Sequence, residues 1–389
     1  MNTKKSSNVD LKQYGMFLAL IAIFLLFYIL SGGANASPTN INNLVMQNGY
    51  VVILATGMLL CVLTGNVDLG VGSIVALCGA SSAILVVDFG APVWLAFLVA
   101  LGIGLLAGLF AGFFIAYLGI PPFVVTLATM LMGRGLTYTI LKAQTKGPLP
   151  DNYVKVGAGF LPTVKVNIGS GTLDLICIFA ATFATVCLIF FEIKSLREKK
   201  KYNFTTSPVW QIVIKDVIIL AIIWFFFIKL GLYNGIPIVL IIMFVLVLMY
   251  HFITSRTVAG RQVYALGGNV KAARLSGINT KKVFFWVYTN MGLLAAVAGI
   301  VLSARNASAT PKAGDGFELD AIGSCYIGGA AAAGGIGTIV GAVVGAFIMG
   351  ILNNGMSLIG WTTDVQKVVK GLVLLGAVTF DLLSKRKKY

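Results

Sequence analysis

The chain has 389 residues, of which 58% are hydrophobic and only 11% are charged, and its formal net charge is +16. Soluble globular proteins carry about 25% charged residues, so this composition excludes a soluble globular domain and indicates a chain that lies in a bilayer. Lys and Arg in loops held on the cytoplasmic side account for the positive charge, which argues against a nucleic-acid partner. We expect a multi-pass protein of the inner (cytoplasmic) membrane.

Twelve apolar runs follow one another along the chain. About 20 apolar residues are needed to cross a bilayer as an α-helix. The expected spans are 14–30, 44–63, 71–88, 92–118, 122–141, 172–191, 212–230, 236–253, 283–303, 320–333, 336–354 and 365–383. We predict an all-α, polytopic fold of about 12 transmembrane helices in a single domain, 1–389, with ten crossings as the alternative.

The tenth run, 320–333, is too short to cross alone as a regular helix. The continuous stretch 320–352 is too long for one span, because a helix of that length would reach roughly 50 Å against about 30 Å of hydrocarbon. Gly334 and Gly335 mark the natural break. We expect a short, discontinuous helix near 320–333, shielded by protein because lipid cannot satisfy its backbone.

The distribution of basic residues predicts which loops face the cytoplasm. With the N-terminus inside, the inner segments are 1–13, 192–211, 254–282 and 384–389, and they hold 18 of the 29 Lys and Arg residues. This bias predicts cytoplasmic N- and C-termini and a basic cytoplasmic loop at 192–211. The asymmetry is incomplete, because the expected outer segment 142–171 also carries four lysines.

Two stretches are faintly similar to each other. DLGVGSIVALCGA (68–80) resembles ELDAIGSCYIGGA (318–330), and on the predicted count the two copies run in opposite directions. We therefore expect an inverted internal repeat, which is a common transporter design. Each copy is followed by glycines at four-residue spacing, which favour close packing of helices. These glycines are Gly104, Gly108, Gly112, Gly341 and Gly345.

No catalytic or metal-binding residues are expected. His251 is the single histidine and has no partner at ligand spacing, and the five cysteines fall in apolar runs without a CxxC pattern. The chain also lacks the GxxxxGK[ST] motif of a phosphate-binding loop. If transport is driven by ATP, the ATPase is a separate chain.

Polar residues at the span breaks are candidates for a transport path. Asp68 lies in TGNVDLGVGS; a carboxylate at membrane depth is costly and marks a site, but the span ends place it near the cytoplasmic boundary, where it could instead cap the next helix. Glu318 and Asp320 could likewise cap the short helix or shape the outer mouth. Arg134 needs to reach the interface or find a partner. The path candidates are Asn66, Asp68, Ser73, Glu318, Asn353 and Asn354.

The loop 254–282 is the most distinctive polar segment. Its run NVKAARLSGI combines helix formers with a glycine stop and predicts a short cytoplasmic helix. The small Ala272–Ala273 face could enter a groove on a partner protein, or the helix could lie on anionic lipid. The residues alone leave both interpretations open.

GRQVYALGGNVKAARLSGI (260–278) closely resembles the cytoplasmic coupling segment in permease subunits of ribose- and xylose-type ABC sugar importers. Further motifs agree in the same order along nearly the whole chain. They are GNVDLGVGS (65–73), GIPPFVVTLATM (119–130), ELDAIGSCYIGGA (318–330), GAVVGAFIMGILNNGMS (341–357) and VVKG (368–371). The extra pair of spans near 172–230 is similar to the xylose or multiple-monosaccharide branch. Gly70 stands where the family usually has Ser, so a hydroxyl contact is not assumed there.

The resemblance implies the transmembrane permease of an ATP-driven importer of xylose or a related pentose or hexose. The implied partners are a cytoplasmic ABC ATPase, which binds ATP and Mg, an extracytoplasmic sugar-binding protein and a second permease copy in a homodimer; this chain itself holds no cofactor. The residues implied to couple to the ATPase are Arg261, Tyr264, Gly267, Gly268, Asn269, Ala272, Ala273, Ser276 and Gly277. The alternatives are import of another sugar-like small molecule, or an ion-coupled secondary carrier, which needs no ATPase dock.

Overall fold

The structure is a computed structural model that describes residues 11–168, 171–202 and 209–386. Within these ranges the chain forms fifteen α-helices, one short 3-10 helix and one two-stranded hairpin. The elements are α1 (Leu11–Leu30), η1 (Ala34–Ala36), α2 (Pro38–Leu63), α3 (Val71–Val87), α4 (Val93–Ala116), α5 (Pro122–Leu141), α6 (Asp151–Ala158), β1 (Lys165–Ile168), β2 (Gly171–Asp174), α7 (Leu175–Lys201), α8 (Val209–Gly231), α9 (Ile238–Arg256), α10 (Val258–Gly268), α11 (Val270–Leu275), α12 (Thr280–Asn306), α13 (Phe317–Ile327), α14 (Ile339–Leu358) and α15 (Thr363–Arg386).

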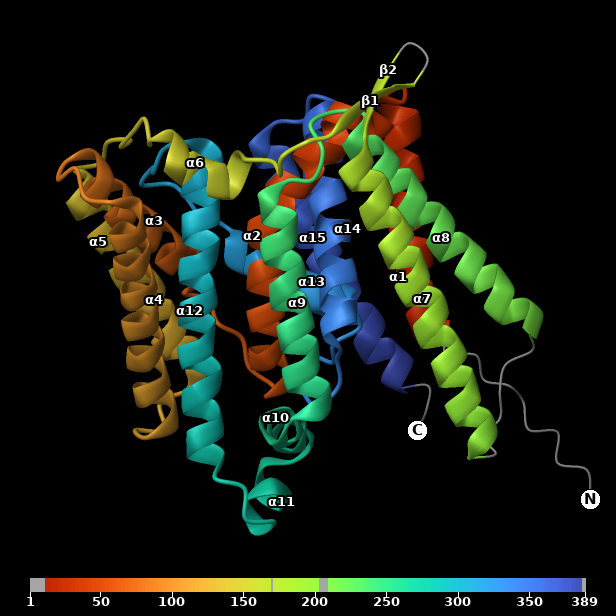
Figure 1. Cartoon of the computed structure of the whole chain (residues 1–389). Helices are drawn as coiled ribbons and strands as arrows, with labels where there is room; N and C mark the ends of the chain where they lie inside the picture. Colours follow the sequence, from red (N-terminus) through yellow and green to blue (C-terminus); the bar gives the residue numbers. More distant parts are fainter. Residues whose placement is uncertain (1–10, 169–170, 203–208, 387–389) are drawn as a thin grey trace, which may run out of the picture.

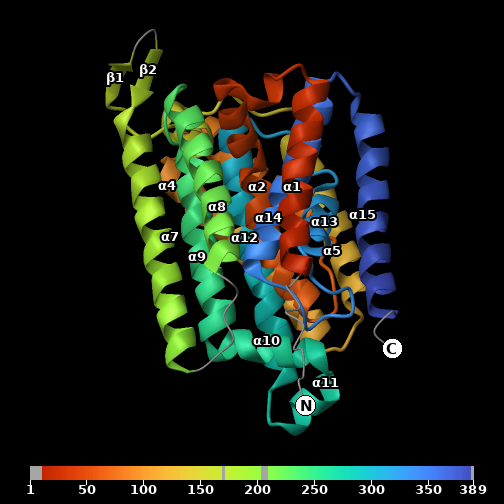
Figure 2. The same cartoon turned by 90° about the vertical axis from the view of Figure 1, so that its right-hand side faces the viewer.

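The helices form one bundle whose two ends differ. Figures 1 and 2 show the long helices running between the ends, with α10 and α11 at one end and α6 and the hairpin at the other. Among the described residues, eight helices are long and apolar enough to cross a membrane, and α3 and the apolar part of α1 are shorter. The predicted polytopic helical membrane protein is therefore confirmed, while the count of twelve crossings stays a prediction.

Helix α12 lies at the centre and packs against α2, α3 and α4. Contact with α4 is close because glycines face it: a Cβ atom added at Gly104 would lie 2.5 Å from the Gly292 carbonyl oxygen, and one at Gly108 would lie 2.7 Å from the Thr289 carbonyl oxygen. Real Cβ atoms do not approach so closely. Since lipid tails are as apolar as side chains, such backbone packing is a main source of helix association in a bilayer. The packing role predicted for this glycine stripe is confirmed.

A short helix does lie in the stretch predicted to be discontinuous, but α13 ends at Ile327 instead of near 333. The α-helix ends there because Gly329 takes φ +83°, outside the right-handed helical region. The preceding Gly328 packs directly on the backbone of Gly341, where no side chain fits. Residues 328–338 form the turn to α14, so the break begins earlier than predicted but includes Gly334 and Gly335, which take φ +86° and +74°.

Two other segments depart from the sequence-based expectations. The hairpin is an exception to the all-α prediction: β1 and β2 pair antiparallel, and the buried Asp174 carboxylate accepts hydrogen bonds from the backbone N–H groups of Val164 and Ile176. The predicted loop 192–211 is largely helical, because α7 continues to Lys201 and α8 begins at Val209. Leu, Arg, Glu and Lys in this stretch are good helix formers, which extends α7 beyond its apolar run. Residues 203–208 of that loop lie outside the described residues.

Candidate coupling segment and transport path

The segment predicted to couple to an ATPase contains two short helices where one was expected. Thr257 caps α10, and Asn269 caps α11 by accepting a hydrogen bond from the Ala272 N–H at 3.0 Å. The glycine stop is present: Gly277 takes φ +83° just after α11, and its N–H donates to the Arg274 carbonyl. Figure 2 shows α10 lying across the end of the bundle with α11 beyond it.

Helix α10 rests on the end of α2 and on the turn between α13 and α14. The Tyr264 hydroxyl donates to the Gly337 carbonyl at 2.7 Å, and the Gly335 N–H donates to the Leu63 carbonyl at 2.9 Å. A Cβ atom added at Gly267 would overlap the Leu63 carbonyl and lie 2.6 Å from the Gly335 nitrogen. Burial raises the pKa of Tyr264, so the hydroxyl stays protonated and can donate. Displacement of α10 would therefore act directly on the turn that follows α13.

The outer face of α11 differs from the predicted one. Ala273 is only 4% exposed and packs inward, so Ala272 and Ala273 cannot form one docking face. The correction follows from helical geometry, because neighbouring positions on a helix point in different directions. Leu275 is instead the side chain that α11 presents outward, and it is 89% exposed. Of the nine predicted coupling residues, those exposed are Arg261, Gly268, Asn269, Ala272, Ser276 and Gly277.

Two helices, α3 and α13, begin inside the bundle and have their first turns in contact. Gly72 and Gly314 meet backbone to backbone, and a Cβ atom added at Gly72 would lie 2.6 Å from Glu318 Oε2. From this junction the two helices run in opposite directions (Figure 1). Helix α3 runs towards the hairpin end of the bundle, and just after it the Lys146 ammonium pairs with Asp88 at 2.8 Å. Helix α13 runs towards the α13–α14 turn that contacts α10. Oppositely directed half-helices of this kind are typical of transporter substrate sites. The inverted sequence repeat itself stays a prediction.

Asp68 lies deeper than predicted. It is buried and lines a small cavity with Gly108, Thr129 and Gly292, which lie in the interior of α4, α5 and α12. The boundary placement was wrong because the chain turns back into the bundle after α2 ends at Leu63. One Asp68 carboxylate oxygen accepts from the Gly70 N–H at 2.8 Å, so Asp68 holds the turn that precedes α3, whose cap position is Gly70.

The other path candidates divide into two groups. Ser73 is buried near this junction, and within the described part of the chain its hydroxyl has no hydrogen-bond partner. Asn353 also faces the half-helices, because its amide donates to Asp320 at 3.4 Å. Asn66, by contrast, donates to the Thr64 carbonyl within its own turn. Asn354 exchanges hydrogen bonds of 2.8 and 3.1 Å with the Asn40 amide on α2, so its amide ties α14 to α2.

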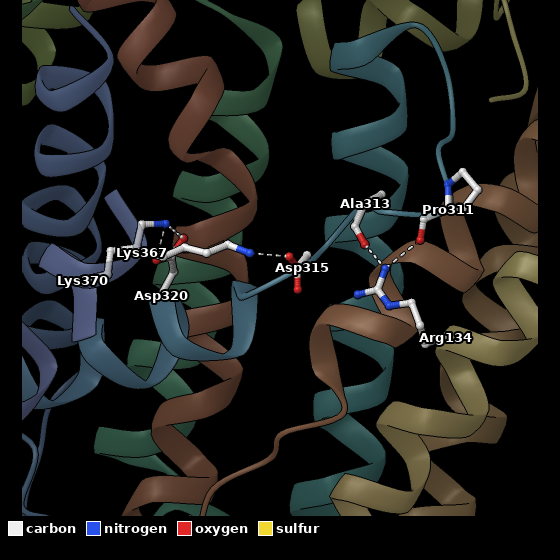
Figure 3. Close-up of polar contacts among 7 residues, drawn as sticks. All are labelled: Arg134, Pro311, Ala313, Asp315, Asp320, Lys367 and Lys370. Atoms are coloured by element: carbon white, nitrogen blue, oxygen red, sulfur yellow. Dashed lines mark hydrogen bonds and ion pairs between the residues drawn. The ribbon is translucent and has the colours of Figure 1, made fainter. Parts of the chain in front are cut away.

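Three cationic side chains contact the start of α13 and the segment before it (Figure 3). Only one of them, Arg134, was singled out from the sequence. The Arg134 guanidinium on α5 donates to the carbonyls of Pro311 and Ala313 at 2.8 and 2.6 Å, which is the partner that its position requires. From α15, the Lys367 ammonium lies 2.8 Å from Asp315 and the Lys370 ammonium lies 2.9 Å from Asp320. A lysine inside the apolar VVKG run was the available signal for the last pair.

No group of three or more His, Cys, Asp or Glu side chains in the described ranges is placed to hold a metal ion.

Residues 40–378 match the family model described as the branched-chain amino acid transport system / permease component, and the chain belongs to this family of membrane permeases. The xylose transport system permease protein XylH of Escherichia coli K12 is 37% identical over 384 residues, which cover 98% of this chain and 94% of that protein. XylH of Haemophilus influenzae is 34% identical over 383 residues, or 98% and 99% of the two chains. The ribose import permease protein RbsC of Escherichia coli K12 is 34% identical over 369 residues, or 93% and 92%. No solved structure matches this chain.

These comparisons confirm the resemblance to sugar permeases. The prediction of a transporter subunit in place of an enzyme is also confirmed, because the family is defined as the permease component of a transport system.

Proposed function

We propose that the chain is the transmembrane subunit of an ATP-driven monosaccharide importer, with xylose or a related pentose or hexose as its substrate. The α10–α11 segment carries the proposal: it stands at one end of the bundle, exposes Leu275 and contacts the turn after α13 through Tyr264. The names of the xylose and ribose permeases support the sugar class.

In this proposal α10 and α11 lie in the cytoplasm and dock on an ABC ATPase, which binds ATP and Mg. The start of α1 and the end of α15 point towards the end of the bundle that carries α10 and α11, as cytoplasmic termini require (Figure 2). An extracytoplasmic sugar-binding protein delivers substrate at the hairpin end, and a second copy of the chain completes a homodimer. The permease adds no chemical step, because ATP-driven docking only biases its two access states.

A secondary, ion-coupled carrier is the second candidate, and buried charge favours it. Asp68 and Asp320 lie inside the bundle, where ionisable side chains commonly mark ion pathways. A carrier that works alone has no use for a protruding segment with an 89% exposed leucine. ATP dependence separates the two candidates. Proteoliposomes that contain the permease and the ATPase, supplied with the sugar-binding protein, should import sugar only when ATP is present, whereas a carrier would need only an ion gradient.

The docking role is tested by Leu275→Ser, which removes the exposed apolar side chain. Leu275 is the last residue of α11, a position where Ser is tolerated. We expect co-purification with the ABC ATPase encoded beside the permease gene to fall roughly tenfold, because a central apolar anchor contributes about 2 kcal/mol or more to an interface. ATP-dependent uptake should fall with it, while the amount of permease in the membrane stays the same.

Val166→Ser on the hairpin is the matched control, since it also removes an exposed apolar side chain but at the opposite end of the bundle. It should leave ATPase binding unchanged. Equal ATPase binding by wild type and Leu275→Ser would show that α11 is not the dock.

A further inference from the structure

We propose that Lys370 is a positioning residue of the transport cycle: its ion pair with Asp320 fastens α15 to the half-helix α13, so that the two helices move as one unit. The role of Lys370 in a transport cycle rests on the proposed function. The attachment of α15 to α13 rests only on the geometry of the two helices.

The pair is largely buried inside the helical bundle. Lys370 is in the second turn of α15, and its ammonium lies 2.9 and 3.0 Å from the two carboxylate oxygens of Asp320. The Asp320 side chain is 1% exposed and the Lys370 side chain 22%. Either charge alone would be costly at this depth, so each holds the other in place.

Besides this ion pair, a narrow face of half-buried apolar side chains, Val369, Val373 and Leu374, holds the described part of α15 to the bundle. The helix lies at the edge of the bundle and packs mainly against α13 (Figure 2). Its outward side chains Val365, Val368, Leu372 and Leu375 are all exposed to the surroundings, which for a membrane protein are lipid. Apolar contact with lipid does not fix the position of a helix, whereas a buried ion pair does.

The segment before α13 is also held from the opposite side. The Arg134 guanidinium binds the Pro311 and Ala313 carbonyls, so residues 311–320 are bracketed by a cation from α5 and a cation from α15 (Figure 3). At its other end α13 leads into the turn that receives the Tyr264 hydroxyl of α10. Through α13, the position of α15 is therefore linked to the coupling segment.

A second pair, which joins α15 to the segment just before α13, gives a matched control. The Lys367 ammonium lies 2.8 Å from Asp315, but these side chains are 67% and 64% exposed. Exposed pairs contribute little to stability, whereas removal of one partner from a buried pair leaves an uncompensated charge. If the attachment of α15 resides in the buried pair, neutralising Lys367 should have almost no effect on α13.

Cys325 provides a native reporter, because it lies in α13 and is fully buried. With the other four cysteines replaced, its rate of reaction with N-ethylmaleimide is measured in proteoliposomes that contain permease alone. The test variants are Lys370→Met with Asp320→Asn, which strands no charge, and the single Lys370→Gln, in which Asp320 can take up a proton. Both should raise the Cys325 reaction rate by about fivefold or more, because α13 opens more often once it is released.

Lys370→Arg, which keeps the cation, and Lys367→Met should both react within about twofold of wild type. A wild-type rate in the double variant or in Lys370→Gln would overturn the proposal, as would an equal acceleration by Lys367→Met. The labelling needs neither ATPase nor sugar. Accelerated labelling in a permease whose wild type imports no sugar would therefore retain the attachment and reject the proposed substrate.

Discussion

Asp68 and Asp320 are both buried carboxylates beside half-helices, yet their surroundings give them different tasks. Asp320 has the Lys370 ammonium as a counter-ion, while the contact found for Asp68 is the neutral N–H of Gly70. A buried carboxylate held only by a backbone donor is expensive to retain for folding alone, since Asn makes the same bond without the charge. This contrast makes Asp68 the better candidate for a direct role in the path.

Asp68→Asn tests that role. The amide oxygen can still accept from the Gly70 N–H, so we expect normal amounts of permease in the membrane and an unchanged melting temperature. Uptake of radiolabelled sugar should fall at least about tenfold if the charge is used in the cycle, which corresponds to about 1.4 kcal/mol. Asp68→Ala is the comparison for structure, because it also removes the acceptor and should lower stability by about 1 kcal/mol. Full uptake by Asp68→Asn would leave only the turn-holding role.

Sequence reasoning named the polar residues of the interior more successfully than it named their partners. Asp68, Ser73 and Glu318 were predicted separately and do gather at the junction of α3 and α13. Asn354 was predicted with Asn353, but adjacent residues on a helix face different neighbours, and Asn354 is paired with Asn40. Lys370 was missed as a site residue because its partner is 50 positions away. A lysine in an apolar run signals that a partner is needed, but the sequence does not say which residue that partner is.

At the scale of elements, α10 is the connection between a docking surface and the interior. At Gly267 its backbone packs against the end of α2 and leaves no room for a side chain, and the Tyr264 hydroxyl bonds the α13–α14 turn. A rigid contact of this kind transmits a displacement better than flexible side chains would. The quality of the fit at Gly267 should therefore matter to coupling as well as to stability.

Gly267→Ala and Gly268→Ala form a matched pair that tests the fit. A Cβ atom at Gly267 would overlap the Leu63 carbonyl, whereas one at Gly268 meets nothing within 4 Å. Both changes have the same helix propensity, so Gly268→Ala should keep wild-type uptake and stability. Gly267→Ala must displace α10 from the end of α2, which should lower the free energy of unfolding by about 1–3 kcal/mol. Thermal unfolding of purified permease and ATP-dependent uptake measure the two effects. Equal behaviour of the two variants would contradict the seat described for α10.

The long helices were predictable because twenty apolar residues in sequence have few other structures available in a bilayer. Helix α10 was missed for a different reason. A helix of 11 residues is marginal in isolation, and this one gains its order by burying Val263 and Leu266 against the bundle. The four-residue strands of the hairpin are equally dependent on their setting, here on the Asp174 carboxylate that closes them.

The whole molecule has two chemically different ends, and their assignment to the two sides of the membrane remains a prediction. Basic residues at the end of α7 and in the α10–α12 region favour the cytoplasm for that end. The lysines near the hairpin oppose this assignment but are fewer.

Single cysteines at Lys201, Lys281 and Lys165, each in a background without the five native cysteines, test the topology. All three positions are exposed. In intact cells an impermeant maleimide should label Lys165→Cys alone, and after permeabilisation it should label all three. Labelling of Lys201→Cys in intact cells would reverse the orientation of the α7–α8 pair and contradict cytoplasmic docking.

The glycine-lined contact between α4 and α12 has a mechanical consequence. Gly104, Gly108 and Gly292 bring two backbones together so closely that neither helix can tilt against the other without collision. These two helices therefore form a stationary frame. The same kind of contact holds α13 to α14, because a Cβ atom added at Gly345 would overlap the Ser324 carbonyl oxygen. We therefore expect any change between access states to move α13 and α14 together against the frame of α4 and α12, with α15 attached to them through Lys370.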